Sequence, residues 1–233
     1  MVLKGRLKLI YDMIPLCDTL SDIGTDHALI PAYALLNGRC NRALACDVKS
    51  GPLERAEKTR RKYELENRVE LRLGSGLTPV AEEEADVIVM AGMGGILITE
   101  LISESINIAR KANYIIIQPM TRQEIIRPFL WENGFEISNE ALAYEGNKLY
   151  LAILTRYTGT RKENCDRIQE LIGDMLIKNN DPLLKDWVKD HIRKQKKALN
   201  GLKSAKATYN AEKIETEEKL LQELTALFNY LGG

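Results

Sequence analysis

Short apolar runs alternate with helix-like stretches along the first two thirds of the chain. Apolar runs of roughly four to eight residues predict buried strands, whereas apolar positions three or four apart predict amphipathic helices. Their alternation favours a parallel sheet with helices on both faces. The predicted strands are Thr19–Ile23, Arg42–Asp47, Val69–Leu73, Asp86–Met90 and Tyr114–Gln118, and the predicted helices cover 28–37, 51–65, 95–110 and 122–133.

Two further strand-like runs follow, Phe135–Ala143 and Lys148–Tyr157. The linking residues YEGNK include Gly146 and Asn147, which suit a tight hairpin turn. We therefore expect an antiparallel pair to end the sheet. The predicted fold is α/β, with a seven-stranded Rossmann-like sheet.

Beyond Thr160 the pattern is helical only. One helix with apolar positions three and four apart ends at Asp181-Pro182. A second stripe runs through 184–205. A third consists of Ile214, Leu221, Leu224, Phe228 and Leu231, and the spacing of seven between Ile214, Leu221 and Phe228 is typical of coiled coils. We expect two domains, a Rossmann-like one at 1–160 that contains the sheet and a helical coiled-coil one at 161–233.

The composition is that of an ordinary globular protein, with 45% hydrophobic and 28% charged residues and no net charge. No apolar run approaches the roughly 20 residues that a membrane-spanning helix needs, and no signal peptide is evident. The four cysteines lack C-x-x-C spacing, and there are only two histidines. We expect a cytoplasmic protein with neither a metal nor a membrane partner.

The zero net charge hides a basic segment, because residues 183–210 hold eight Lys or Arg against two Asp. Basic side chains three or four apart form a stripe on one helix face, and the amino terminus adds three more. They are candidate nucleic-acid contacts. The alternative is the solvated face of a coiled coil. The residues concerned are Lys189, Arg193, Lys196 and Lys197, together with Lys4, Arg6 and Lys8.

Polar and glycine-rich loops follow the predicted parallel strands, where ligands bind in such sheets. The first loop, DIGTDH, has only Gly24 where a dinucleotide fingerprint needs G-x-G-x-x-G, which argues against NAD. Asp47 ends the second strand, at a spacing suited to accepting hydrogen bonds from ribose hydroxyls. A solvated carboxylate at the start of the next helix is the alternative for Asp47.

Three more strand ends carry candidate groups. LRLGSGLTP offers Gly74 and Gly76, which allow backbone to approach a flat ligand, or simply form a turn. VIVMAGMGGIL has three glycines in four positions at a predicted helix start, where amides can meet a substrate. Gln118 ends the fifth strand as a ligand contact or as a polar strand terminator.

Together these loops resemble the class I S-adenosylmethionine-dependent methyltransferases. S-adenosylmethionine has no phosphate, so a three-glycine cradle is unnecessary, and its cationic groups favour nearby carboxylates. LSDIGTDHALIP, ALACDV, LRLGSGL, ADVIVMAGMGG, IIIQPM and NKLYLAIL resemble the bacterial tRNA (adenine-22-N1)-methyltransferase family more closely, over almost the whole chain.

The resemblance implies methyl transfer from S-adenosylmethionine to N1 of one tRNA adenine, and it assigns residues to parts of the site. Where many related enzymes have an acidic residue in the third loop, this chain has Ser75. The implied cofactor-binding residues are Asp22, Gly24, Thr25, Asp26 and His27 in the first turn, Asp47 at the ribose, Gly74, Ser75 and Gly76 at the adenine, and Ala91 and Gly92 within the methyl-transfer segment 91–95.

Adenine N1 carries an in-plane lone pair and no proton, so it can attack the methyl directly without a strong base. The AGMGG loop also lacks the Asn-Pro-Pro-aromatic signature of exocyclic-amine methyltransferases. Positioning and stabilisation of the cationic product then dominate. The candidate catalytic residues are Asp26, His27, Gly92 and Gln118. Alternatively, Asp26 caps the following helix and His27 packs against it.

Two other functions remain compatible with the sequence. One is a methyltransferase acting on a small molecule or protein, with the coiled coil serving dimerisation. The other is a non-catalytic module that recruits partners, while an NAD oxidoreductase fits least well. The interpretation favoured here is a monomeric tRNA methyltransferase.

Overall fold

The computed structural model divides into two compact units, Met1–Glu163 and Asn164–Gly233, and it describes residues 1–84, 86–204 and 211–232. The division lies close to Thr160, where the sequence becomes purely helical. Ala205 and Lys206, which the sequence assigned to the helical stripe and the basic segment, lie outside the described residues.

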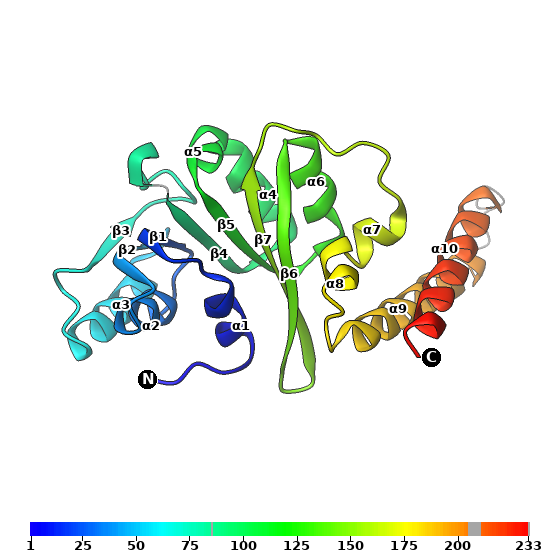
Figure 1. Ribbon diagram of the computed structural model, residues 1–233, viewed down its shortest axis with the longest axis horizontal. Helices are drawn as coiled ribbons and strands as arrows, with labels where there is room; N and C mark the ends of the chain where they lie inside the picture. Colours follow the sequence, from blue (N-terminus) through cyan, green and yellow to red (C-terminus); the bar gives the residue numbers. More distant parts are fainter. Residues whose placement is uncertain (85, 205–210, 233) are drawn as a thin grey trace. The chain divides into compact units, whose positions relative to one another are not determined.

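The first unit is built on one sheet of seven strands in the order β3-β2-β1-β4-β5-β7-β6 (Figure 1). The first five strands are parallel, and β7 pairs antiparallel with both β5 and β6. This confirms the predicted α/β sheet and its terminal hairpin. The strands are β1 Cys17–Ile23, β2 Cys40–Asp47, β3 Val69–Leu73, β4 Val87–Gly94, β5 Tyr114–Thr121, β6 Phe135–Glu145 and β7 Lys148–Tyr157.

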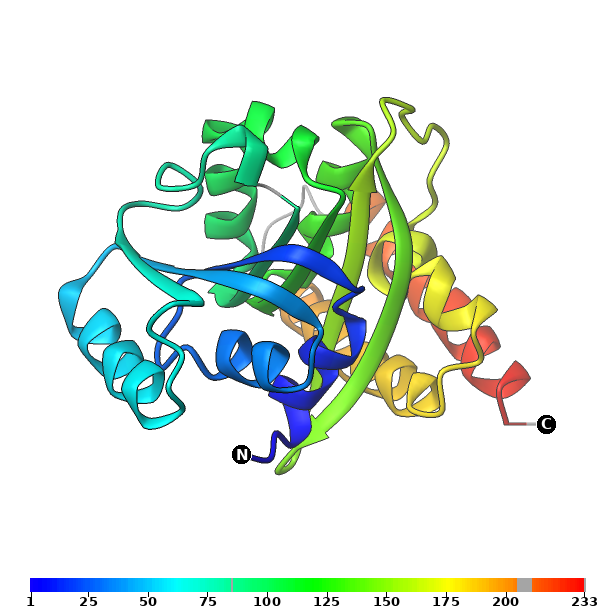
Figure 2. The same ribbon diagram turned by 60° about the vertical axis from the view of Figure 1, so that its left-hand side comes forward.

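Helices cover both faces of this sheet, with α1, α2 and α3 on one side and α4, α5 and α6 on the other (Figure 2). Buried aliphatic side chains fill the layer between α1, α2 and the sheet, among them Ile10, Leu20 and Leu35. The helices are α1 Gly5–Met13, α2 Leu29–Leu36, α3 Ser50–Lys62, α4 Gly95–Glu104, α5 Ile106–Lys111 and α6 Ile126–Glu132, with short 3-10 turns at Glu82–Glu84 and Gln123–Ile125.

The glycine-rich segment after the fourth strand differs from its prediction. Strand β4 continues through Gly94, with register shifts against β5 between Ala91 and Met93 and between Met93 and Gly94. The segment is therefore the irregular end of a strand up to Gly94, and helix α4 follows directly at Gly95, where the sequence predicts a helix start. The single helix predicted over 95–110 is also interrupted, because Ser105 separates α4 from α5.

The second unit contains α7 Arg167–Leu171, α8 Asp174–Lys178, α9 Leu184–Ser204 and α10 Ala211–Tyr230. A single helix was predicted across α7 and α8, but Gly173 has a φ of 96° and breaks it. Helices α9 and α10 lie antiparallel, because Lys185 contacts the Phe228 ring and Gln195 donates to the Glu217 carbonyl.

Helix α10 buries only part of its predicted apolar stripe. Its most buried side chains are Leu220 and Leu224, four residues apart, at 4% and 0% exposure. Ile214, Leu221 and Phe228 are only half-buried. Leu224 belongs to the predicted stripe and Leu220 does not, and their spacing of four places both on one face of the helix.

Gly95 lies where α4 begins, against the backbone of Arg122. A Cβ added at Gly95 would lie 2.3 Å from the Arg122 carbonyl oxygen. Overpacking against backbone costs about 3 kcal/mol. We expect Gly95→Ala to lower the free energy of unfolding by about that amount in urea titrations.

The control is Gly201→Ala in α9, since a Cβ there meets nothing within 4 Å. It should raise the stability by about 0.5–1 kcal/mol, because alanine favours a helix. Equal effects of the two substitutions would contradict the tight approach at Gly95.

Candidate functional site

Two cavities open at the edge where the parallel strands end, next to the point between β1 and β4 at which the strand order reverses. This is the usual ligand position in open α/β sheets. The smaller cavity measures about 320 Å³ and the larger about 400 Å³. Gly24, Asp26, Ala91 and Gly92 line both, so the cavities share one wall.

The turn after β1 is held close to the neighbouring strands. The amides of Gly24 and Thr25 both donate to the Cys46 carbonyl, at 2.8 and 3.0 Å. Gly24 has a φ of 75°, and a Cβ there would lie 2.8 Å from Cε of Met93. The positive φ favours glycine at this position, and a Cβ there would also require the end of the Met93 side chain to move.

Asp22 is the buried acid of the smaller cavity, with 6% of its surface exposed. Burial is the main influence on its carboxyl group and raises the pKa to about 6. A hydrogen bond with Thr25 and the positive charge of Arg6 oppose that rise in pKa, whereas the negative charge of Asp47 adds to it. A cation placed beside Asp22 would favour the ionised carboxylate.

Asp26 and His27 lie on the exposed rim of the cavities. The guanidinium of Arg55 on α3 binds Asp26 through both Nε and Nη2, with an Nε to Oδ1 distance of 2.8 Å. His27 Nε2 lies 3.4 Å from the other oxygen of Asp26. Asp26, Arg55 and His27 therefore form a charged group beside the wall that the cavities share.

The alternative role of Asp26 as a helix cap is excluded. Helix α2 begins at Leu29, and its N-cap residue is Ala28. The N-cap makes no side-chain hydrogen bond to the amides of the first turn. The Ala28 amide instead donates to Thr25 Oγ1, at 3.2 Å. The Asp26 carboxylate is thus directed to Arg55 and not to the helix amides.

The larger cavity combines one acid with an apolar wall. Asp47 lies half-buried in it and accepts a hydrogen bond from the Lys49 amide at 2.8 Å. Val48 and Leu97 also line it although they are 62% and 45% exposed, so apolar surface faces the opening. Such a surface suits a flat ring.

The third loop completes this larger cavity with Gly74, Ser75 and Gly76. Gly76 has a φ of 53°, and a Cβ there would lie 2.7 Å from Cδ2 of Leu101. Ser75 lines the cavity and is exposed, and its carbonyl accepts from Thr78 Oγ1. The predicted cofactor residues of the first four loops are therefore gathered at one edge.

Gln118 is not among the lining residues of either cavity, but it contacts Gly92, which lines both. Gln118 is fully buried at the end of β5, and its Oε1 accepts from the Gly92 amide at 3.1 Å. The same oxygen accepts from Nη1 of Arg6 at 2.9 Å. Arg6, predicted only as an RNA contact, is therefore part of the site's framework.

The other predicted RNA contacts lie outside the cavities. Lys4 and Lys8 are exposed on or next to α1, where Lys8 pairs with Asp12. The cations predicted on α9, namely Lys189, Arg193, Lys196 and Lys197, are all exposed.

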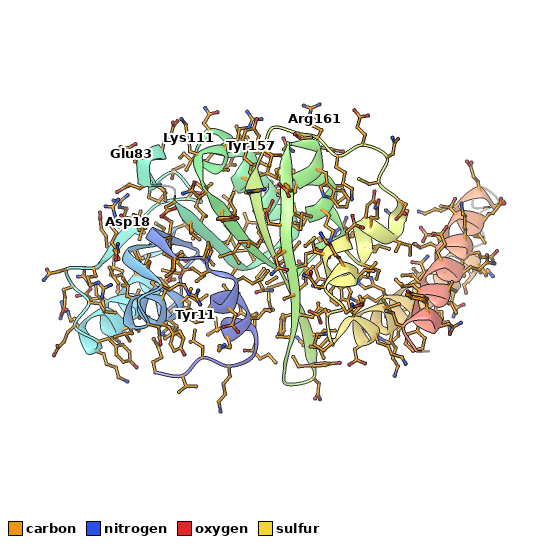
Figure 3. All side chains as sticks on the ribbon, viewed as in Figure 1. Tyr11, Asp18, Glu83, Lys111, Tyr157 and Arg161 are labelled. Atoms are coloured by element: carbon orange, nitrogen blue, oxygen red, sulfur yellow. The ribbon has the colours of Figure 1, made fainter. Side chains whose placement is uncertain are left out.

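The parallel strands begin at the opposite edge of the sheet, away from both cavities. Residues at that edge include Asp18 and Lys111 (Figure 3).

Sequence reasoning missed Arg55, Val48 and Leu97. A usable signal existed for Arg55 and Val48, because the segment after β2 starts at the ligand edge, so its first residues belong to the site. Leu97 and Leu101 are four apart at the start of α4 and thus share a face. Arg6 carries no such signal, since only the packing of α1 brings it to Gln118.

Over residues 1–84, 86–204 and 211–232, no three His, Cys, Asp or Glu side chains gather as a metal-binding group. Within the same ranges, no helix has both the length and the apolar character needed to span a bilayer.

Proteins of known family are similar in sequence to most of this chain. Residues 3–153 match the family model described as a methyltransferase domain. The tRNA (adenine(22)-N(1))-methyltransferase of Bacillus subtilis (strain 168) is 32% identical over 193 residues, which cover 81% of each chain.

Solved structures show the same relationship. A candidate tRNA (m1A22) methyltransferase of Streptococcus pneumoniae, in complex with S-adenosyl-L-methionine, is 25% identical with a TM-score of 0.79, covering 98% of this chain and 100% of the other. M. capricolum TrmK, in complex with S-adenosyl-homocysteine, is 23% identical with a TM-score of 0.81, covering 99% and 100%, and supports the fold. The chain therefore belongs to the tRNA (adenine(22)-N(1))-methyltransferase family.

Proposed function

We propose that this protein transfers a methyl group from S-adenosylmethionine to N1 of adenine 22 in tRNA. The observation that carries the proposal is the pair of cavities with one shared wall, formed by Gly24, Asp26, Ala91 and Gly92. Two ligands bound in such cavities can meet at that wall. Family membership supplies the identity of the two ligands.

The larger cavity fits the adenosine half of the cofactor. Its volume of about 400 Å³ lies within the range of small-molecule sites. Asp47 would accept hydrogen bonds from the ribose hydroxyls, and Val48 and Leu97 would cover the adenine ring. The open backbone at Gly74 and Gly76 leaves room for that ring.

The smaller cavity fits the cationic end of the cofactor and the target base. Asp22 supplies a buried carboxylate near the shared wall, which favours the positive groups of S-adenosylmethionine. The turn at Gly24 lets backbone approach without a side chain. Two carboxylates, Asp22 and Asp26, line this cavity, in agreement with a cofactor that carries positive groups and no phosphate.

When bound, S-adenosylmethionine supplies an electrophilic methyl group on a sulfonium. The chain's residues orient the adenine so that its N1 lone pair points at that methyl group, and they exclude water from the shared wall. No residue has to remove a proton before attack, since N1 carries none. Asp26, supported by Arg55 and His27, stabilises the positive charge that develops on the adenine.

The tRNA must present adenine 22 turned out of its stack, because N1 lies on the pairing edge. Recognition of a folded RNA rests on shape and phosphate contacts. We assign those contacts to Lys4 and Lys8 and to the exposed cations of α9.

Transfer of labelled methyl groups to tRNA transcripts tests the function. We expect incorporation into a transcript with adenine at nucleotide 22 and none into a matched transcript with guanine there. Incorporation into a small molecule or protein from an extract, with none into tRNA, would replace the proposed substrate. Calorimetry that detects no S-adenosylmethionine binding would leave only a non-catalytic module.

The cations of α9 give a separate prediction for the salt dependence of tRNA binding. Replacing Lys189, Lys196 and Lys197 by glutamine should lower the slope of log Kd against log salt by about 2 to 3, because each lost phosphate contact removes nearly one released counterion. Filter binding at several salt concentrations measures this slope. The control replaces Lys213 and Lys219 of the acidic helix α10, and an equal loss there would contradict the assignment.

A further inference from the structure

Gln118 is saturated with hydrogen bonds from the protein itself. Its Oε1 accepts from Arg6 Nη1 at 2.9 Å and from the Gly92 amide at 3.1 Å. Its Nε2 donates to the Pro119 carbonyl at 3.1 Å and lies 3.6 Å from Sδ of Met120. With 0% of its surface exposed, Gln118 has no group to offer a substrate.

Arg6 is held in place by the packing of α1. Ile10 and Tyr11 bury the inner face of this helix, and the Tyr11 ring meets Tyr33 of α2 edge to face with centroids 4.6 Å apart. The start of α1 lies against β6, because a Cβ on Gly5 would meet Cβ of Glu145 at 3.0 Å. Nε of Arg6 also lies 3.8 Å from that carboxylate. The guanidinium is therefore aimed at Gln118 by the fold.

Gly92 is the residue that this chain of contacts controls. It has a φ of 79° and lies within the first register shift of β4, where the ladder to β5 lapses between Ala91 and Met93. Gln118 Oε1 supplies an acceptor for its amide at that position. Because Gly92 lines both cavities, the direction of its peptide shapes the wall at which the ligands meet.

We propose that Arg6 is a positioning residue for methyl transfer: it orients Gln118, and Gln118 in turn fixes the Gly92 peptide of the shared wall. The inference rests on the proposed function. It gives Arg6 a role separate from RNA binding, and it makes Gln118 a support of the site without contact to the reacting atoms. Arg6 thereby links the first helix of the chain to the place of reaction.

A double-mutant cycle with Arg6→Met and Gln118→Met tests this chain of contacts. Each single variant should lower kcat by about 10- to 100-fold, since a small misplacement of the reacting groups is enough for such a loss. KM for tRNA and the Kd for S-adenosylmethionine should stay within about threefold of wild type. The double variant should be no slower than the worse single variant, because both changes break one contact path. Lys111→Met, an exposed cation at the opposite edge, is the control (Figure 3).

Amide hydrogen exchange of the free protein provides a readout that does not need activity. The Gly92 amide should exchange faster in both single variants and at the wild-type rate in Lys111→Met. Unchanged exchange, additive losses in kcat, or a loss confined to tRNA affinity or to cofactor affinity would each overturn the proposal. If wild type lacks methyl transfer while the exchange results hold, the proposed function fails and the contact path stands.

Discussion

Replacing Asp22 by asparagine is expected to weaken S-adenosylmethionine binding by roughly 10- to 100-fold at pH 8, because a buried charged partner is worth about 1.5–3 kcal/mol. The wild-type affinity should also depend on pH. The pKa of Asp22 is raised to about 6, chiefly by burial, so the carboxylate that attracts the cation is present above that pH. Affinity should fall about tenfold for each pH unit below 6 and level off above it.

The same substitution should stabilise the free protein. A carboxyl group whose pKa is raised on folding contributes stability at low pH, and that contribution is lost as the pH rises through about 6. At pH 8 the ionised and buried Asp22 therefore costs about 2 to 3 kcal/mol. The neutral amide of Asp22→Asn avoids this cost, and the melting temperature should rise by about 4–8 °C.

Calorimetric titration with S-adenosylmethionine between pH 5 and 8, together with thermal melts at the same pH values, measures both effects. Asp18→Asn at the opposite end of β1 is the matched control and should change neither the affinity nor its pH dependence. An Asp22→Asn variant that keeps wild-type affinity at pH 8 would show that the carboxylate does not face the cofactor. The charge on Asp22 is thus expected to strengthen cofactor binding and to lower the stability of the free protein.

Replacing Asp26 by asparagine is expected to lower the single-turnover rate of methyl transfer by about 100-fold. The loss of one preorganised electrostatic contact in an active site commonly has an effect of this size. Asparagine keeps the shape and one acceptor oxygen for Arg55, so the turn should remain folded. Affinity for the cofactor should change by less than about threefold if Asp26 acts on the charged adenine product.

Quench-flow measurement of one turnover, beside the cofactor Kd, separates the two possible roles. Glu104→Gln, an exposed change at the end of α4, is the control. A loss confined to cofactor binding would assign Asp26 to the cofactor and remove it from the methyl-transfer step. His27→Ala, assayed in the same way, should show a smaller loss in rate, because His27 contacts only the second oxygen of Asp26.

The sequence predicts which loop residues gather at the ligand edge of the sheet, because the rule for parallel sheets needs only strand ends. Asp22, Asp47 and Gly76 lie far apart in the chain, yet each lies at or just after the end of a parallel strand, and the fold places such positions at one edge. The prediction of Gly24 from a shortened glycine loop relies on the same local logic. These residues could be found without knowing any contact between helices.

Tertiary packing decided what the sequence could not predict. In the sequence, Arg6 cannot be distinguished from any other basic residue of an amphipathic helix. Only the packing of α1 against α2 and β6 directs its side chain to Gln118. The continuation of β4 through Gly94 depends on a register shift against β5, which apolar periodicity does not encode. Leu220 is buried beside the predicted Leu224 in α10 for a similar reason, since the partner helix decides which face packs.

The most direct test of the account is to locate the methyl group at atomic level in the product RNA. Unmodified tRNA incubated with the protein and S-adenosylmethionine would be digested with nucleases and examined by mass spectrometry against 1-methyladenosine and N6-methyladenosine standards. The account predicts 1-methyladenosine at nucleotide 22 and at no other adenine. N6-methyladenosine at that nucleotide, or 1-methyladenosine at a different one, would contradict it.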